Sequence, residues 1–173
     1  GLDMEATGAP RLIDLSDSRQ GDSPIVVINA ATGERQLIWS ELDANTEKEA
    51  ELSLLIRVAK NLEDGQRYIV ALRNMKNAAG EMIPPTELFR AYRDNVSTDS
   101  DAAEARRPAM EEIFSALLSA NIAREDLYLA WDFTVSSTRS LSERILHMRD
   151  TAFAALAGGT PEFTIDSVED LSM

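Results

Sequence analysis

The sequence contains no cysteine and only one histidine, His147, among its 173 residues. The lack of thiols excludes a disulfide framework, a cysteine nucleophile and thiolate ligation of zinc or iron–sulfur clusters within this chain. A single histidine also excludes a metal site built from several imidazoles. No stretch approaches the roughly 18 consecutive apolar residues of a membrane helix, so we do not expect membrane insertion.

Basic residues are scarce as well. The chain has 17 lysines and arginines against 30 acidic residues, which gives a formal net charge of −13. Such a charge repels phosphate backbones, so nucleic acid is not an expected partner. The hydrophobic share of 44% and the charged share of 27% are those of a globular protein. Its length suits one domain, or one domain with an appendage.

The first half of the sequence predicts β-strands joined by short turns. Residues 25–28 and 35–39 flank a glycine-containing turn and predict a hairpin. Residues 52–58 alternate between apolar and other side chains, and 67–73 form the best strand of this half. A further short strand is predicted at 88–92. The short connections favour antiparallel pairing.

A helix and then a strand are predicted next. The helix covers about residues 105–120, with one apolar stripe: Met110, Ile113, Phe114, Leu117 and Leu118. Pro108 either lies in its first turn or kinks a helix that begins earlier, near Asp101. The strand places one set of side chains on a single face: Leu127, Leu129, Trp131, Phe133 and Val135.

A second helix is predicted at about residues 140–157, where Ser140 and Glu143 have capping-box spacing. Its apolar stripe comprises Leu141, Ile145, Met148, Ala152 and Leu156. Residues 163–168 have the pattern of another strand. Because the chain begins without methionine and ends on this strand, we expect it to be a fragment of a longer protein.

Nucleophile and phosphate motifs are absent. There is no Gly-x-Ser-x-Gly elbow and no glycine-rich loop that opens a helix. His147 is either a general base or a half-exposed helix histidine, and the second interpretation is favoured because no serine motif accompanies it. Paired carboxylates occur at Glu111/Glu112, Asp43/Glu47 and Glu125/Asp126. In so acidic a chain these pairs indicate a solvated surface more than glycosidase chemistry.

An acidic loop and a set of aromatic residues are weaker candidates for a binding site. The acidic loop 94–104 has Asp99 and Asp101 at calcium-loop spacing, but it lacks the turn glycine and the twelfth-position glutamate. The aromatic residues could form a sugar-stacking platform or pack in the core, and core packing is favoured. They are Trp39, Trp131, Tyr68, Tyr92 and Tyr128. We therefore predict no catalytic, cofactor-binding or metal-ligating residue, and no cofactor.

Two stretches together resemble known families. Residues 61–72 and 76–83 read NLEDGQRYIVAL and KNAAGEMI, which resembles the L-x-x-G-x-x-Y-x-V … K-D-x-x-G-x-x-I pattern of bacterial Ig-like domains. Residues 126–137 read DLYLAWDFTVSS, which resembles a strand in the N-terminal region of secreted bacterial lipases and related α/β-hydrolases. There, a helical segment interrupts an Ig-like sandwich before an A-W-x-F-T strand. The likeness covers about residues 24–156.

The resemblance implies an α+β fold, namely an antiparallel Ig-like β-sandwich with two inserted or appended helices. Residues 1–23 would be an N-terminal extension or linker, 24–157 the sandwich with both helices, and 158–173 a linker and the start of a following strand or domain. The matched positions are turn and core residues, among them Gly65, Gly80 and Trp131. The resemblance therefore transfers no catalytic residue.

The leading functional hypothesis is a non-catalytic accessory or structural domain of a larger, exported bacterial hydrolase-like protein. Its partners would be the neighbouring domains of its own parent chain, and that parent would be extracellular or on the cell surface. One alternative is a module that binds carbohydrate or a surface polymer, which requires Trp39, Tyr92 and Tyr128 on one exposed face. The other is a hydrolase that uses a carboxylate pair in a concave pocket.

Overall fold

The computed structural model describes residues 1–46, 48 and 51–169. The chain divides into two compact units, Gly1–Val135 and Ser136–Met173. The first unit is α+β, as the order of strands and helices predicts. The second predicted helix belongs to the other unit.

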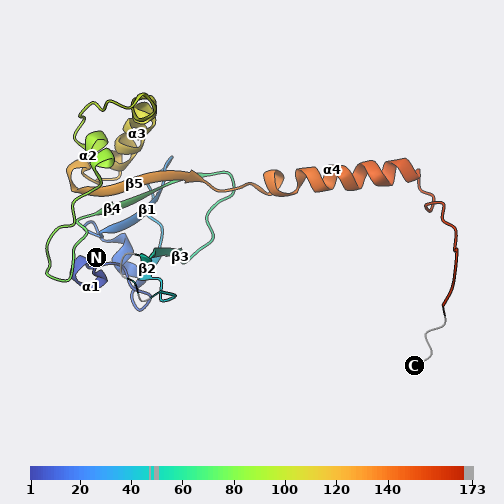
Figure 1. The fold of residues 1–173 in the computed structure, drawn as a ribbon, viewed down its shortest axis with the longest axis horizontal. Coiled ribbons are helices and arrows are strands. Elements are labelled where there is room, and N and C mark those ends of the chain that lie inside the picture. The colour runs from blue at the N-terminus through green and yellow to red at the C-terminus, as the bar shows by residue number, and fades with distance from the viewer. Residues whose placement is uncertain (47, 49–50, 170–173) are drawn as a thin grey trace. The chain divides into compact units, whose positions relative to one another are not determined.

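A three-stranded antiparallel sheet forms the centre of the first unit (Figure 1). Strand β4 (Arg67–Arg73) lies between β1 (Ile25–Asn29) and β5 (Leu127–Thr134). A separate antiparallel pair, β2 (Ile38–Leu42) and β3 (Leu54–Val58), lies on the side of this sheet away from helices α2 and α3. The predicted antiparallel pairing is thus confirmed, in one sheet of three strands and one of two.

The predicted hairpin of residues 25–28 with 35–39 forms only next to its turn. Ile28 bridges to Arg35, and the Gln36 N–H donates to the Val27 carbonyl at 2.8 Å. The partner of β1 over its whole length is β4, with Val27 opposite Val70. After Gln36 the chain leaves for the second sheet, where Ile38 pairs with Val58. The glycine turn predicts pairing only between the residues next to it. The strand partner of β1 lies about forty residues away, so the turn carries no information about it.

Two helices cover one face of the central sheet. Helix α3 (Asp101–Ser119) begins at the earlier of the two expected positions, so Pro108 lies within it. The strand predicted at 88–92 is wrong, because these residues belong to helix α2 (Glu87–Arg93). A run of five residues does not fix the periodicity, and Thr86 accepts a hydrogen bond from the Phe89 N–H as the helix cap.

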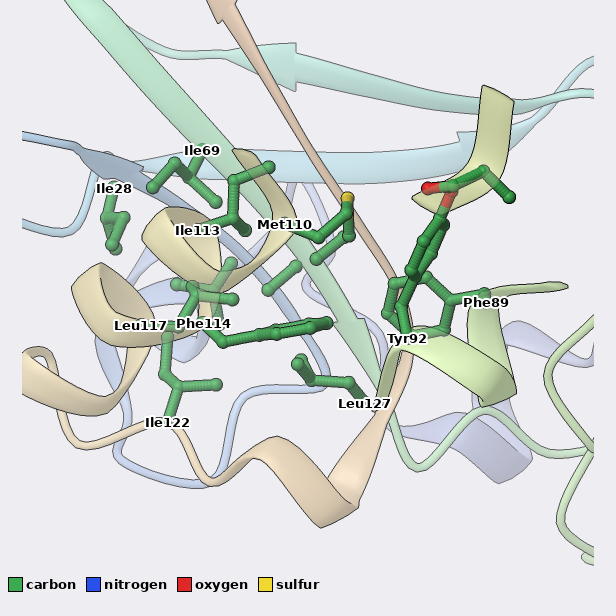
Figure 2. Close-up of a cluster of buried hydrophobic side chains, with 14 residues drawn as sticks. Ile28, Ile69, Phe89, Tyr92, Met110, Ile113, Phe114, Leu117, Ile122 and Leu127 are labelled. Carbon is green, nitrogen blue, oxygen red and sulfur yellow. The ribbon is translucent and has the colours of Figure 1, made fainter. Parts of the chain in front are cut away.

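The core under these helices is closed (Figure 2). Phe89 and Phe114 meet edge to face, with ring centroids 6.1 Å apart. The buried side chains come from β1, β4, β5, both helices and the turn after α3: Val26, Ile28, Ile69, Ala71, Phe89, Tyr92, Ala103, Met110, Ile113, Phe114, Leu117, Ile122, Leu127 and Ala130. The predicted stripe of α3 is therefore its buried face, apart from Leu118, which is exposed.

The N-terminal residues pack against the opposite side. Helix α1 (Met4–Thr7) and the 3₁₀ helix η1 (Leu15–Arg19) precede β1. The carbonyl of Pro10 accepts hydrogen bonds from both the N–H and the hydroxyl of Ser40, at 2.8 and 3.0 Å. Residues 1–23 are thus bonded to the second sheet.

Strand β5 contains a bulge that reverses the orientation of its first residue. Leu72 pairs with Leu129 and Arg73 pairs with Leu127, so Tyr128 is the extra residue. Leu127 consequently packs under the helices, while Trp131 packs on the other face. The predicted common face for Leu127 and Trp131 is therefore wrong, since strict alternation holds only beyond the bulge.

The second unit consists, in its described part, of helix α4 (Thr138–Leu156) and the segment after it. Ser137 caps α4 by accepting a hydrogen bond from the Ser140 N–H at 3.1 Å. None of the side chains of α4 is buried. Residues 160–169 have no regular secondary structure, so the strand predicted at 163–168 does not form. No helix in the described ranges has a stretch long and apolar enough to cross a membrane.

Candidate functional site

An apolar groove of about 440 Å³ opens between the two sheets of the first unit. We call it the inter-sheet groove. Every side chain that lines it is hydrophobic: Val27, Leu54, Ile56, Val58, Val70, Leu72, Leu129, Trp131 and Phe133. It contains no ionisable group, so its surface offers hydrophobic contact and neither acid–base chemistry nor metal ligation.

The alternation of strand side chains forms the walls of the groove. On β3, Leu54, Ile56 and Val58 turn towards it, as the predicted period of two requires. Arg57 turns outward, and its Nε donates a hydrogen bond to Glu41 Oε1 at 2.6 Å. The charged groups of β2 and β3 therefore pair on the outer face, and the inner face stays apolar.

The groove is open because a sheet of two strands faces a sheet of three. Within the described residues β3 has β2 as its only strand partner, so its other edge is unpaired. Leu129 and Trp131 of β5 are half-buried, and Phe133 is 36% exposed. On the β1 side the groove is closed, since the chain crosses between the sheets there and buries Ile38 completely.

Tyr68 forms one end of this apolar surface. Its ring stacks on Phe133, with centroids 6.0 Å apart. Its hydroxyl oxygen accepts a hydrogen bond from the Glu63 N–H at 3.0 Å, which fixes the turn before β4. Because that hydroxyl is bonded to the backbone and Tyr68 is only 2% exposed, its side chain contributes to packing and is not available as a polar ligand group.

The acidic loop at 94–104 is held by arginines. Glu104 accepts hydrogen bonds from the Thr98 N–H and hydroxyl, at 2.8 and 2.9 Å, and from Arg107 at 2.7 Å. These bonds, that from Arg107 foremost, lower the pKa of Glu104 to about 2. Asp94 is paired with Arg93 in the same way.

The loop also borders a hollow of about 610 Å³ beside α2, which is larger than the inter-sheet groove. Two of the polar residues that line it are already hydrogen-bonded, Asp94 to Arg93 of α2 and Thr98 to Glu104. In the described part of the chain, no three histidine, aspartate or glutamate side chains gather to hold a metal ion.

The carboxylate pairs do not converge on one position. Glu111 binds Arg124 through both oxygens, at 2.6 and 2.7 Å, and this pairing lowers its pKa. Glu112 instead points to Arg67, at 3.4 Å. Glu47, the partner of Asp43, lies outside the described residues. Glu125 and Asp126 lie in the 3₁₀ turn Arg124–Asp126 before β5, and the Asp126 carbonyl accepts a hydrogen bond from the Asn74 N–H at 3.1 Å.

The aromatic residues of the proposed sugar platform come from three separate elements. Tyr92 is buried between α2 and α3, and its hydroxyl donates to the Ala103 carbonyl at 2.9 Å. Trp39 lies on the outer face of β2 opposite Arg57, and Tyr128 occupies the bulge of β5. Of the aromatic residues singled out in the sequence, Trp131 lines the inter-sheet groove, and Tyr68 stacks on Phe133, which also lines it.

His147 is exposed on α4. Ser142, one turn earlier, donates its hydroxyl to the Thr138 carbonyl at 2.6 Å. Across the described ranges no hydrogen bond connects His147 with a serine or a carboxylate, so the geometry does not form a catalytic dyad.

Comparison with known proteins gives no relative: no family model matches the chain, and neither a curated protein nor a solved structure is significantly similar to it. The groove itself could not be read from the sequence. Its residues belong to four strands, and each strand's pattern predicts only that one face is buried. What leaves the face open is the number of strands on each side.

Proposed function

We propose that this chain is a non-catalytic docking module. Its inter-sheet groove takes an extended β-strand, with alternating apolar side chains, from a neighbouring domain of the parent protein. The observation that supports this function is the position of the groove directly beside the unpaired edge of β3. An unpaired edge offers backbone hydrogen bonds, and an adjacent apolar groove offers sites for alternate side chains.

The strand count favours an occupant of this shape. Neighbouring strands lie about 4.8 Å apart in a sheet, so one added strand beside β3 would make the second sheet as wide as the first. Its inward side chains would cover Phe133, which is 36% exposed, and Leu129 and Trp131, which are half-buried. Covering them removes apolar surface from water, which is the driving force for binding.

The proposal includes a finer view of the fold, in which the first unit is a reduced Ig-like sandwich. Two features support it. The two antiparallel sheets enclose a largely apolar interior. In addition, Tyr68 near the start of β4 bonds through its hydroxyl to the backbone five residues upstream, as the tyrosine corner of Ig-like sandwiches does. With the resemblance of residues 126–137 to the N-terminal region of secreted lipases, a hydrolase domain is the neighbour we propose.

Trp131 provides a direct test, because it lies in the groove and only one other tryptophan is present. In the full chain with Trp39→Phe, Trp131 is the sole tryptophan. The probe is a synthetic peptide of alternating valine and threonine with lysine at both ends. Binding is expected to shift the Trp131 emission to shorter wavelength in a saturable manner, since the peptide displaces water from the indole.

Two adjacent residues of β3 give matched variants. Ile56→Asp places a charge in the groove and is expected to abolish the emission shift, whereas Leu55→Asp on the outer face is expected to preserve it. A peptide with proline at its central position removes a backbone donor and is expected to bind more weakly. No saturable shift with the original peptide, or equal loss in both variants, would overturn the proposal.

A further inference from the structure

Helix α4 presents an apolar stripe without a partner in the described structure. Leu141, Ile145 and Met148 are 73, 61 and 58% exposed. The helix has 19 residues and is therefore roughly 28 Å long. Helices of this length owe most of their stability in proteins to burial of such a face.

The spacing of the stripe is that of a coiled-coil seam. Four positions of the predicted stripe, 141, 145, 148 and 152, alternate in steps of four and three, which is the a/d pattern of a heptad. The pattern continues at Ala155, and Leu156, the last residue of the predicted stripe, lies beside it. Leu141, Met148 and Ala155 occupy d positions, and Ile145 and Ala152 occupy a positions. Leu146 and Phe153 lie outside this seam, at b positions.

We infer that α4 is a dimerisation helix, which pairs antiparallel with α4 of a second copy of the chain. The charge on the helix permits this approach, although the whole chain carries −13. Three arginines on α4 are set against two acidic residues, so α4 is nearly neutral: Arg139, Arg144, Arg149, Glu143 and Asp150. The two helices can meet without the repulsion that acts between the rest of the chains.

The charges beside the seam select the antiparallel orientation. Arg144 is a g position and Arg149 the following e position. In a parallel pair these two arginines would face each other across the interface, and like charges there are destabilising. In an antiparallel pair centred between Ile145 and Met148, Arg144 faces Thr151 and Arg149 faces Ser142 of the second copy.

The side-chain volumes select the same orientation. The seam has large side chains at its N-terminal end, Leu141 and Ile145, and small side chains at its C-terminal end, Ala152 and Ala155. A parallel pair would place alanine against alanine and leave a void at one end. The antiparallel pair places Leu141 against Ala152 and Ile145 against Met148, which gives layers of similar volume along the interface.

The first test is the mass of the full chain in solution, by sedimentation equilibrium over a range of concentrations. We expect a reversible dimer. Ile145→Asp is expected to give a monomer at every concentration, whereas Leu146→Asp, next to it but outside the seam, is expected to leave the dimer intact. Both variants lose an apolar side chain to aspartate within the same helix, so a general loss of helicity would affect them equally.

The orientation is tested by disulfide formation, because the chain has no cysteine of its own. Leu141→Cys and Ala152→Cys chains are mixed under mild oxidation. An antiparallel pair is expected to give mainly the mixed 141–152 disulfide, and a parallel pair the 152–152 disulfide. A monomeric chain, a dimer that Ile145→Asp does not disrupt, or a predominant 152–152 product would each overturn the inference. The result is independent of the inter-sheet groove.

Discussion

The two faces of the central sheet differ in how completely they are covered, although the same three strands form both. Under α2 and α3, Ile28, Ile69 and Leu127 are almost inaccessible to solvent. On the groove side, Trp131 is half-buried and Phe133 is 36% exposed. Both faces are apolar, so composition does not distinguish them. The difference is that two helices span three strands, whereas a sheet of two strands does not.

Arginine side chains reinforce the closed face. Arg124 lies over the Phe114 ring, 4.1 Å from its centroid, and donates to Glu111 and to the backbone carbonyls of Arg93 and Tyr92. Arg107 similarly links α3 to the Val96 carbonyl at 2.7 Å and stacks on Tyr92. The inter-sheet groove contains no such group, and its remaining surface is available for contact with another segment.

The largest expected effect contrasts a phenylalanine on each face. Phe114→Ala should lower the free energy of unfolding by about 3–5 kcal/mol, because it leaves a cavity in a closed core. Phe133→Ala should cost only about 1–2 kcal/mol, because part of that ring already contacts water. Urea denaturation of both variants measures the two values. Equal losses would show that the groove face is as closed as the helix face.

A smaller loss of stability is expected when Arg124, which links α2 to α3, is replaced. Arg124→Met keeps a long side chain over Phe114 but removes the bonds to Glu111 and to two backbone carbonyls. We expect a loss of about 2 kcal/mol, since these acceptors lose a charged donor. The matched change Arg139→Met, at an exposed intrahelical pair on α4, should have little effect. Similar losses in both variants would refute a special contribution of Arg124.

The smallest expected effect is on stability at low pH, through Glu104 of α3. The pKa of Glu104 is about 2 in the folded chain, below the ordinary value, so its ionised form stabilises the fold. That contribution is complete above the ordinary glutamate pKa of about 4.3 and is lost as the pH falls towards 2. Glu104→Gln should therefore reduce the fall in the urea midpoint between pH 5 and pH 2.

The control for this prediction is Asp99→Asn on the same loop. The Asp99 side chain makes no hydrogen bond in the described structure, so this change removes a carboxylate of the loop without removing a bond, and it should alter the midpoint profile less than Glu104→Gln does. A Glu104→Gln profile parallel to that of the parent chain would contradict the assignment of this stabilisation to the Thr98 and Arg107 bonds.

Local patterns in the sequence predict most single elements of this fold. The continuous apolar run within residues 67–73 predicts β4, and the three-and-four spacing from Met110 to Leu117 predicts α3 with its buried face. Both patterns extend over at least seven residues. The five residues at 88–92 do not, and there the capping by Thr86 decides in favour of a helix. That hydroxyl, three residues before Phe89, was the signal available in the sequence.

Pairing between distant segments could not be predicted in the same way. The partner of β1 is chosen by the packing of a sheet whose third strand begins at Leu127. The bulge at Tyr128 likewise depends on its partner strand, and it alone turns Leu127 towards the helices. The inter-sheet groove is a product of these non-local choices, because it exists only when β1, β4 and β5 lie opposite β2 and β3.

The central position of β4 has a consequence for how the chain folds. Its two neighbours come from residues 25–29 and 127–134, so most contacts of the sheet join segments far apart in the sequence. Such topologies fold slowly, because long loops must close before the pairing stabilises them. During synthesis, β1 can bond only to residues 34–36 until β4 has left the ribosome, and the sheet is complete only once residue 134 has followed. The apolar run Ile25–Ile28 is therefore exposed to aggregation on a nascent chain until β4 pairs with it.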